Sequence, residues 1–383
     1  MGDQFKQYAT KKLFLLIIAL INLCWMHDSP ALAAQVSAGL LKAKKDAEAK
    51  GYIFATSKDE IVAKAKEEGK LEVLTFLEND ARKAMIEGFQ KKYPFGHVSS
   101  ENIGGTDEYQ RFILEMKTGR AKRWDTVHIS NQVYWEYPPY LKKFDILGMA
   151  EHGVLTIPSR VIDPNHRTIV SKATQVSVAA YNKKLMSPDK VPNTWEGFLK
   201  PEFKGRKFIA NVRPLSIANL VPAWGLERAL EFAKKFAEQK PVWNRGSGRA
   251  LTSMAAGEHA LFVGVNLGSV LEAQLKDPTK NLELQLLDPV PVRFGSADGI
   301  LATSSRPYTG LLWLEFQCSP EGQAILDKYG PADGSMFIPG SMQHNLLRGR
   351  PVSFLGWDLH QNLEQWVEKL VEAYGFPMAE KGR

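Results

Sequence analysis

Cysteine is nearly absent from this sequence, which has two in 383 residues, Cys24 and Cys318. Cys24 lies in an N-terminal segment that we expect to be removed, so the remaining chain cannot form an internal disulfide. Cys318 ends the apolar stretch Leu311–Cys318, which predicts a buried, unreactive thiol. The core must therefore come from apolar packing, which a chain of this length and 44% hydrophobic content allows.

Motifs for catalysis and metal binding are also missing. The sequence has no Gly-x-Ser-x-Gly elbow, no phosphate-binding Gly-x-x-x-x-Gly-Lys-Ser/Thr loop, no Gly-x-Gly-x-x-Gly fingerprint and no His-Glu-x-x-His. The histidines after the N-terminal segment are scattered without metal-ligand spacing. We therefore predict no catalytic residue, no metal site and no cofactor. The alternative is an enzyme, which would show turnover and two titratable groups facing each other across a cleft.

Long apolar runs are limited to one, Leu13–Met26, which follows three lysines and precedes the small residues of Ala31-Leu32-Ala33. This pattern is typical of a secretory signal peptide, so we assign residues 1–33 to one, with cleavage before Ala34. A membrane anchor is disfavoured because spanning takes about 20 apolar residues. A lipid attached to Cys24 is disfavoured because bulky Leu23 precedes it.

Charge does not point to a nucleic acid. The formal net charge is +7, and lysine and arginine are spread along the chain instead of gathering in one stripe. We therefore predict no nucleic-acid partner. The mildly basic balance does favour the attraction of an anionic ligand.

What is present is an alternation of strands and helices. A buried-strand pattern at Leu71–Phe76 is followed by a polar loop and an amphipathic helix at Ala81–Tyr93, and strand patterns at His97–Ile103 and Asp125–Ile129 repeat it. The second is followed by a helix at Glu108–Lys117 and the third by one at Gln132–Lys142. This pattern predicts an α/β fold with mostly parallel sheets flanked by helices.

Two long extended segments, Thr168–Tyr181 and Leu282–Val292, bracket the middle third of the chain. They predict a two-lobed molecule in which one discontinuous lobe is interrupted by the other, with a hinge and a ligand cleft between them. The expected divisions are a signal peptide at 1–33, a helical extension at 34–70, lobe 1 at 71–172 and 300–383, lobe 2 at 173–299, and hinge crossings near 173–181 and 289–299.

Three stretches carry a resemblance to a known family. Residues 181–206 hold Tyr-Asn-Lys-Lys-Leu, then Pro-Asn-Thr-Trp-Glu-Gly-Phe-Leu, then Pro-Glu-Phe-Lys-Gly-Arg, a pattern that resembles periplasmic solute-binding proteins of ABC importers. Asp59–Leu74 is similar to the usual mature N-terminus of the ferric-ion and related branch, and Ser319–Tyr329 is similar to its closing helix. Trp195 and Phe203, within the first stretch, are expected to be scaffold residues buried in the core.

Iron binding in that branch implies a pair of adjacent tyrosines in the second lobe. This sequence has no tyrosine between Tyr181 and Tyr308, and the corresponding stretch is Val265-Asn266-Leu267-Gly268-Ser269. The phenolate ligands that a hard trivalent cation prefers are therefore missing there.

Polar residues at predicted strand ends are the candidate ligand contacts, because parallel sheets bind ligands at the carboxyl ends of their strands. Arginine forks favour carboxylate, phosphate or sulfonate groups. Of the aromatic run Tyr134–Tyr140, we expect one or two rings at most to face the cleft. The predicted ligand-binding residues are Asn79, Thr106, Ser130, Asn131, Tyr181, Arg213, Ser216, Arg245, Asn266 and Asp298.

The resemblance implies an exported, periplasmic protein that captures a small, anionic or polar organic ligand by hinge closure and delivers it to an importer. Its expected partners are the membrane permease and ATPase, and we expect a monomer. The alternatives are ferric iron held through an exogenous anion, and a binding protein linked to a membrane sensor.

Overall fold

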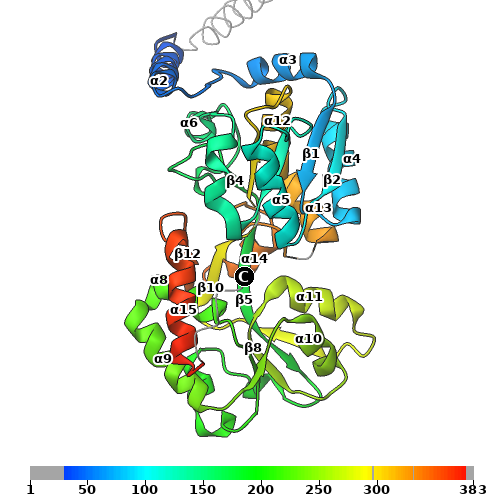
Figure 1. Ribbon diagram of the computed structural model, residues 1–383, viewed down its shortest axis with the longest axis vertical. Coiled ribbons are helices and arrows are strands. Elements are labelled where there is room, and N and C mark those ends of the chain that lie inside the picture. Colours follow the sequence, from blue (N-terminus) through cyan, green and yellow to red (C-terminus); the bar gives the residue numbers. More distant parts are fainter. Residues whose placement is uncertain (1–29, 296, 331, 377–383) are drawn as a thin grey trace, which may run out of the picture.

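The computed structural model describes residues 30–295, 297–330 and 332–376 (Figure 1). The chain forms two lobes stacked along the long axis of the molecule and joined by a narrow middle (Figure 1). Each lobe has a sheet with helices on its faces, so the expected two-lobed α/β fold is confirmed. No helix among the described residues is both long and apolar enough to cross a membrane.

The first lobe is built on a five-stranded sheet with the order β2-β1-β3-β11-β4. β2, β1 and β3 are parallel, whereas β11 is antiparallel to both β3 and β4. All residues of β3 are buried, because helices cover both faces of the sheet. The strands are β1 (Leu71–Thr75), β2 (Val98–Asn102), β3 (Thr126–Ile129), β4 (Val170–Ser171) and β11 (Ala297–Ile300).

Apolar spacing explains the helices of this lobe. In α4, Ala81, Met85 and Phe89 are four residues apart and all buried in the core of the lobe. The helices are α4 (Asn79–Lys92), α5 (Thr106–Lys117), α6 (Ile146–Glu151), α12 (Pro307–Gln317) and α13 (Pro320–Tyr329), with the 3-10 turns η1 (Asn131–Glu136), η2 (Pro138–Tyr140) and η3 (Ser159–Val161).

The helix predicted at Gln132–Lys142 is wrong. The chain forms the two short 3-10 turns η1 and η2 instead, separated at Tyr137. Pro138 and Pro139 lack the amide hydrogen that a continuous helix needs, and proline restricts the residue before it.

The N-terminal extension packs on the first lobe. It comprises α2 (Pro30–Ala49) and α3 (Lys58–Glu68). The Glu68 carboxylate accepts hydrogen bonds from the first amides of α12, Tyr308 N at 3.0 Å and Thr309 N at 2.7 Å. Ala47 and Phe54 are buried in the lobe's core. The predicted cleavage point before Ala34 lies within α2, and residues 1–29 of the predicted signal peptide lie outside the described residues.

The second lobe has a seven-stranded mixed sheet with the order β12-β10-β5-β8-β6-β7, and β9 pairs with the far end of β5. Its central strand β5 is antiparallel to β10, β8 and β9. The strands are β5 (Thr174–Asn182), β6 (Ile209–Asn211), β7 (Val242–Asn244), β8 (Leu261–Asn266), β9 (Leu282–Gln285), β10 (Val290–Phe294) and β12 (Val352–Leu355).

The scaffold role predicted for Trp195 and Phe203 is confirmed, because both are buried in the core of this lobe. Trp195 also donates its indole N–H to the carbonyl of Pro289 at 3.2 Å. The helices of the lobe are α7 (Leu215–Ala218), α8 (Val221–Trp224), α9 (Leu226–Glu238), α10 (Gly248–Ala255), α11 (Leu267–Lys276), α14 (Met342–Leu347) and α15 (Leu363–Ala373), with the 3-10 turns η4 (Pro188–Lys190), η5 (Glu196–Leu199), η6 (Pro201–Phe203) and η7 (His360–Asn362).

The chain crosses between the lobes three times. It passes from β4 into β5, returns from β10 to β11, and crosses again between α13 and α14. Thr174 joins the first and third crossings, because its hydroxyl donates to Gln343 Oε1 at 2.5 Å and its amide donates to the carbonyl of Gly334 at 2.9 Å.

The C-terminal region differs from the expected division. α12 and α13 lie on the first lobe, but β12 pairs with β10 of the second lobe, and α15 packs against α9 there (Figure 1). Residues from α14 onward therefore belong to the second lobe, so the predicted placement of all of 300–383 in the first lobe is wrong. The cause is strand pairing over a separation of more than 50 residues, which local pattern does not encode.

Candidate functional site

A cleft of about 670 Å³ lies between the lobes and is lined by residues of both. The first lobe contributes Phe76, Gly105, Thr106, Tyr109, His128, Ser130, Asn131 and Trp135. The second lobe and its crossings contribute Gln175, Arg213, Leu215, Arg293, Gly295, His360, Gln361, Leu363 and Glu364.

The first-lobe wall follows the carboxyl ends of parallel strands. Phe76 comes directly after β1, Ser130 and Asn131 come after β3, and Thr106 begins the helix that follows β2. Gly105 caps that helix with a φ of +81°, a backbone conformation that strains residues with a side chain. Neighbouring parallel strands end at the same edge of the sheet, so the residues that follow them meet at the cleft.

The second-lobe wall combines neighbouring strands of its sheet. Gln175 of β5 and Arg293 of β10 are directly opposite each other in the antiparallel ladder, so both side chains point to the same face. Gly295 leaves room beside them, since a Cβ there would lie 3.2 Å from Gln175 Cγ. Arg213 reaches the cleft from the loop that follows β6.

The C-terminal segment closes the side of the cleft. Its Trp357 ring stacks on Phe294 at a centroid distance of 4.2 Å and lies 6.0 Å from the ring of Tyr134 in the first lobe. His360 contacts the same tyrosine edge-on at 6.0 Å. These contacts hold the start of α15 against the cleft, where Glu364 is in its first turn.

Two arginines and one carboxylate make up the permanently charged lining. Arg213 Nη2 contacts both carboxylate oxygens of Glu364, at 2.6 and 2.7 Å. Arg293 makes no ion pair in the part of the chain that the structure describes, although the charges of Arg213 and Glu364 both act on it. Burial, and then the nearby charge of Arg213, lower the pKa of Arg293 to about 10, so it remains charged at neutral pH.

His128 lines the cleft and also contacts a buried ion pair at the hinge. Its Nδ1 lies 3.2 Å from Asp298 Oδ1, and the second carboxylate oxygen of Asp298 pairs with Lys172 Nζ. Burial alone would raise the pKa of Asp298, but the charge of Lys172 and the hydrogen bond to His128 outweigh it and hold that pKa at about 2. Burial lowers the pKa of His128 itself.

This arrangement is typical of a protein that holds a ligand between two hinged domains. The sequence matches a family model described as bacterial extracellular solute-binding protein over residues 149–362, more than half of the chain. The chain belongs to this family. It is a solute-binding protein, and the predicted resemblance is confirmed.

Solved structures share the fold of this solute-binding protein at low sequence identity. Iron-bound HitA from Pseudomonas aeruginosa is 16% identical with a TM-score of 0.55, over 80% of this chain and 100% of HitA. FutA (IdiA) from Trichodesmium, in complex with iron and citrate, is 17% identical with a TM-score of 0.59, over 81% and 100%. The substrate-binding protein of an ABC transporter from Agrobacterium tumefaciens is 19% identical with a TM-score of 0.56, over 81% and 96%. No curated protein matches the sequence.

Four of the predicted ligand-binding residues of this solute-binding protein line the cleft: Thr106, Ser130, Asn131 and Arg213. Asn131 also donates its side-chain amide to the carbonyl of Phe294 at 3.3 Å, a bond from the first lobe to a hinge strand.

Three of the others lie elsewhere in the second lobe. Tyr181 is buried in the core, six residues along β5 from Gln175, which is about 20 Å in a strand. Asn266 caps α11 by accepting from Ser269 N at 3.3 Å. Arg245 is exposed in the loop after the edge strand β7.

The remaining three are also outside the lining. Ser216 packs against the backbone of Gly264, since a Cβ there would lie 2.2 Å from its hydroxyl oxygen. Asn79 begins α4 and is exposed, with Arg82 bonded to its side chain at 2.7 Å. Asp298 is buried behind His128 instead of facing the cleft.

Four lining residues outside the predicted set come from long-range strand pairing or from the C-terminal segment: Arg293, Gln175, His360 and Glu364. His128, a fifth, lies within the predicted strand Asp125–Ile129 but was not in that set. Arg293 stands beside the return crossing in the sequence, and its place in the strand alternation is the one signal that could have singled it out. Of the aromatic run, Trp135 lines the cleft, while Tyr134 and Tyr137 are buried.

The described residues include no group of three or more His, Cys, Asp or Glu side chains able to hold a metal ion. The tyrosine of the cleft, Tyr109, donates its hydroxyl to the carbonyl of Ile103 at 3.3 Å. Burial raises the pKa of that phenol, which opposes the phenolate form that iron requires. The lone Cys318 is buried, as predicted, and burial raises its pKa to about 12.

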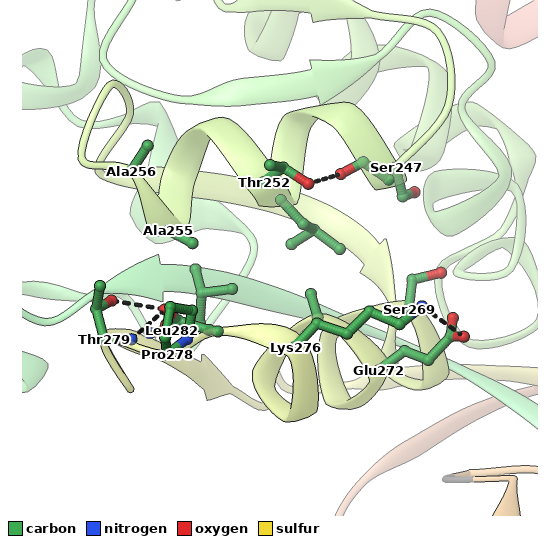
Figure 2. A pocket seen from close by; sticks show the side chains of 14 residues that line it. Ser247, Thr252, Ala255, Ala256, Ser269, Glu272, Lys276, Pro278, Thr279 and Leu282 are labelled. Carbon is green, nitrogen blue, oxygen red and sulfur yellow. Dashed lines mark hydrogen bonds and ion pairs between the residues drawn. The ribbon is translucent and has the colours of Figure 1, made fainter.

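A second hollow of about 610 Å³ lies between α10 and α11 of the second lobe (Figure 2). The two helices run side by side, with Ser247 and Ser269 near one end of the hollow and Ala256 near the other (Figure 2). The cation beside it, Lys276, pairs with Glu272 at 3.4 Å. Its lining comes from one lobe, so a molecule bound there would not bridge the hinge.

Proposed function

We propose that this solute-binding protein captures a small organic anion between its lobes and delivers it to the permease and ATPase of an ABC importer, from the periplasm. The observation that carries the proposal is Arg293, a guanidinium in the cleft wall with no ion-pair partner among the described residues. A partly buried, unpaired charge lowers the stability of the protein. A ligand that neutralises this charge therefore binds more tightly.

The chemistry of Arg293 suits a carboxylate or another oxyanion. A guanidinium presents a planar fork of donors that matches the two oxygens of such a group. Gln175 beside it adds an amide that can donate to the same group.

The opposite wall offers an acceptor as well as donors. An ionised Asp298 can only accept hydrogen bonds, so Nδ1 of His128 carries the proton and Nε2 is left as an acceptor. Since His128 lines the cleft, we expect the ligand to carry a hydroxyl or ammonium donor on that side.

Ligand capture by hinge closure follows from this division of contacts. A ligand that touches Arg293 from one lobe and the His128 side from the other stabilises the state in which the lobes are close. The proposal is a binding role without catalysis.

A second candidate ligand is ferric iron held through an exogenous anion, favoured by the iron-bound structures that share the fold. Two guanidinium groups in the cleft oppose a bare trivalent cation, but they would suit an anion that accompanies it.

The test is a thermal-shift screen of the exported chain against mono- and dicarboxylates, phosphates, sulfonates, amino acids, polyamines and ferric citrate. A ligand at 100 times its dissociation constant adds about 2.7 kcal/mol of stability. Stabilisation by an organic anion, with a smaller radius of gyration in solution scattering, supports the proposal. Stabilisation by ferric citrate but not citrate supports iron. Stabilisation by polyamines alone contradicts both.

A further inference from the structure

The C-terminal segment places one carboxylate, that of Glu364, inside a cleft otherwise lined by cations and neutral groups. Its 65% exposed side chain pairs with Arg213, which is 48% exposed. The charged side chains that line the cleft are therefore two guanidinium groups and one carboxylate. Burial, together with the nearby Arg293, lowers the pKa of His360, and burial lowers that of His128, so neither adds a charge at neutral pH.

The position of Glu364 is fixed by packing. The residue before it, Leu363, and Trp366 two residues after it are buried in the core of the second lobe. Glu364 also lies in the first turn of an eleven-residue helix, where a negative charge is favourable. The carboxylate is thus held at the cleft.

We propose that Glu364 determines ligand specificity by matching the charge of Arg213, so that the cleft accepts a ligand with a single anionic group and disfavours dianions. The proposal rests on the proposed function of the cleft. With Arg213 matched, Arg293 is the one guanidinium left for the ligand. A second negative group on the ligand would face the Glu364 carboxylate, and like charges brought together in a closing, water-poor cleft repel strongly.

Folding stability does not account for this ion pair. Exposed pairs contribute roughly 0.2–1 kcal/mol, so Glu364 can be changed without unfolding the protein. The same lobe holds a matched control in Glu196, which pairs with Arg228 at 2.6 Å outside the cleft lining.

The experiment is calorimetric titration of the full exported chain with two pairs of probes: butyrate against succinate, and methanesulfonate against sulfate. The wild type is expected to bind the monoanion of each pair at least tenfold more tightly. E364Q is expected to gain tenfold or more for the dianions and less than threefold for the monoanions. E196Q is expected to match the wild type.

A double variant, R213Q with E364Q, restores the wild-type charge of the cleft and is expected to regain the preference for monoanions. An unchanged ratio of dianion to monoanion affinity in E364Q overturns the specificity role. A double variant that keeps the ratio of dianion to monoanion affinity of E364Q also overturns the specificity role. If the wild type binds none of the four anions, the proposed function itself fails, which is a different result from binding with an unchanged ratio.

Discussion

Two clusters of opposite charges lie a short distance apart in this molecule, and they differ in exposure. Lys172, Asp298 and His128 are each 6% exposed or less, and they connect the first and second crossings of the hinge to the first-lobe wall of the cleft. Arg213 and Glu364 are about half exposed at the cleft wall. Both clusters pair a cation with a carboxylate, but the first is buried and the second is in contact with water.

Exposure decides how much each ion pair contributes to folding stability. A buried charge that loses its partner has no water to replace it, so the hinge cluster is fixed. An exposed pair can lose one partner at little cost to folding, because water solvates the charge that is left.

The largest expected effect is on stability at the hinge. Asp298→Asn leaves the ammonium of Lys172 buried without a counter-charge, which typically costs about 3–5 kcal/mol. Urea unfolding of the variant at pH 7 measures this loss. A loss below about 1 kcal/mol would show that the buried cluster behaves like the exposed pair.

The same cluster predicts a pH dependence. The folded pKa of Asp298 is about 2 and lies below its ordinary value of 3.8, so the unfolded state binds the proton first on acidification. The stabilisation is complete above pH 4 and is lost as the pH falls towards 2. The difference in unfolding free energy between wild type and Asp298→Asn should narrow by about 2 kcal/mol over this interval. A constant difference contradicts the assignment.

The smallest expected effect is on the stability of the cleft pair. Glu364→Gln should lower the free energy of unfolding by less than about 1 kcal/mol, because the pair is exposed and screened. Urea unfolding in 50 mM and 500 mM salt checks this, and Glu196→Gln serves as the matched control. A loss comparable to that of Asp298→Asn would show that the exposed pair contributes as much to folding as the buried cluster.

Local pattern predicts much of the fold and the first-lobe wall. In a strand-loop-helix unit, the residue after a strand is at the cleft edge, so Thr106, Ser130 and Asn131 could be named from sequence spacing alone. The same rule placed Arg213 after β6.

The rest of the cleft depends on pairing that no local pattern encodes. Gln175 and Arg293 meet through the register of two antiparallel strands that are more than 100 residues apart. Tyr181 was chosen on the same strand as Gln175, at the end away from the hinge. Glu364 reaches the cleft because β12 adds to the edge of the second sheet and returns the chain there.

The affinity of Arg293→Met for the strongest anionic ligand that the screen identifies tests whether this guanidinium binds the ligand, with Arg228→Met as the control. We expect at least a 100-fold loss of affinity, about 2.7 kcal/mol, with no loss of unfolding free energy, because a charge without an ion-pair partner is removed. Unchanged affinity in a folded Arg293→Met protein would contradict the claim that this cleft binds its ligand through that guanidinium.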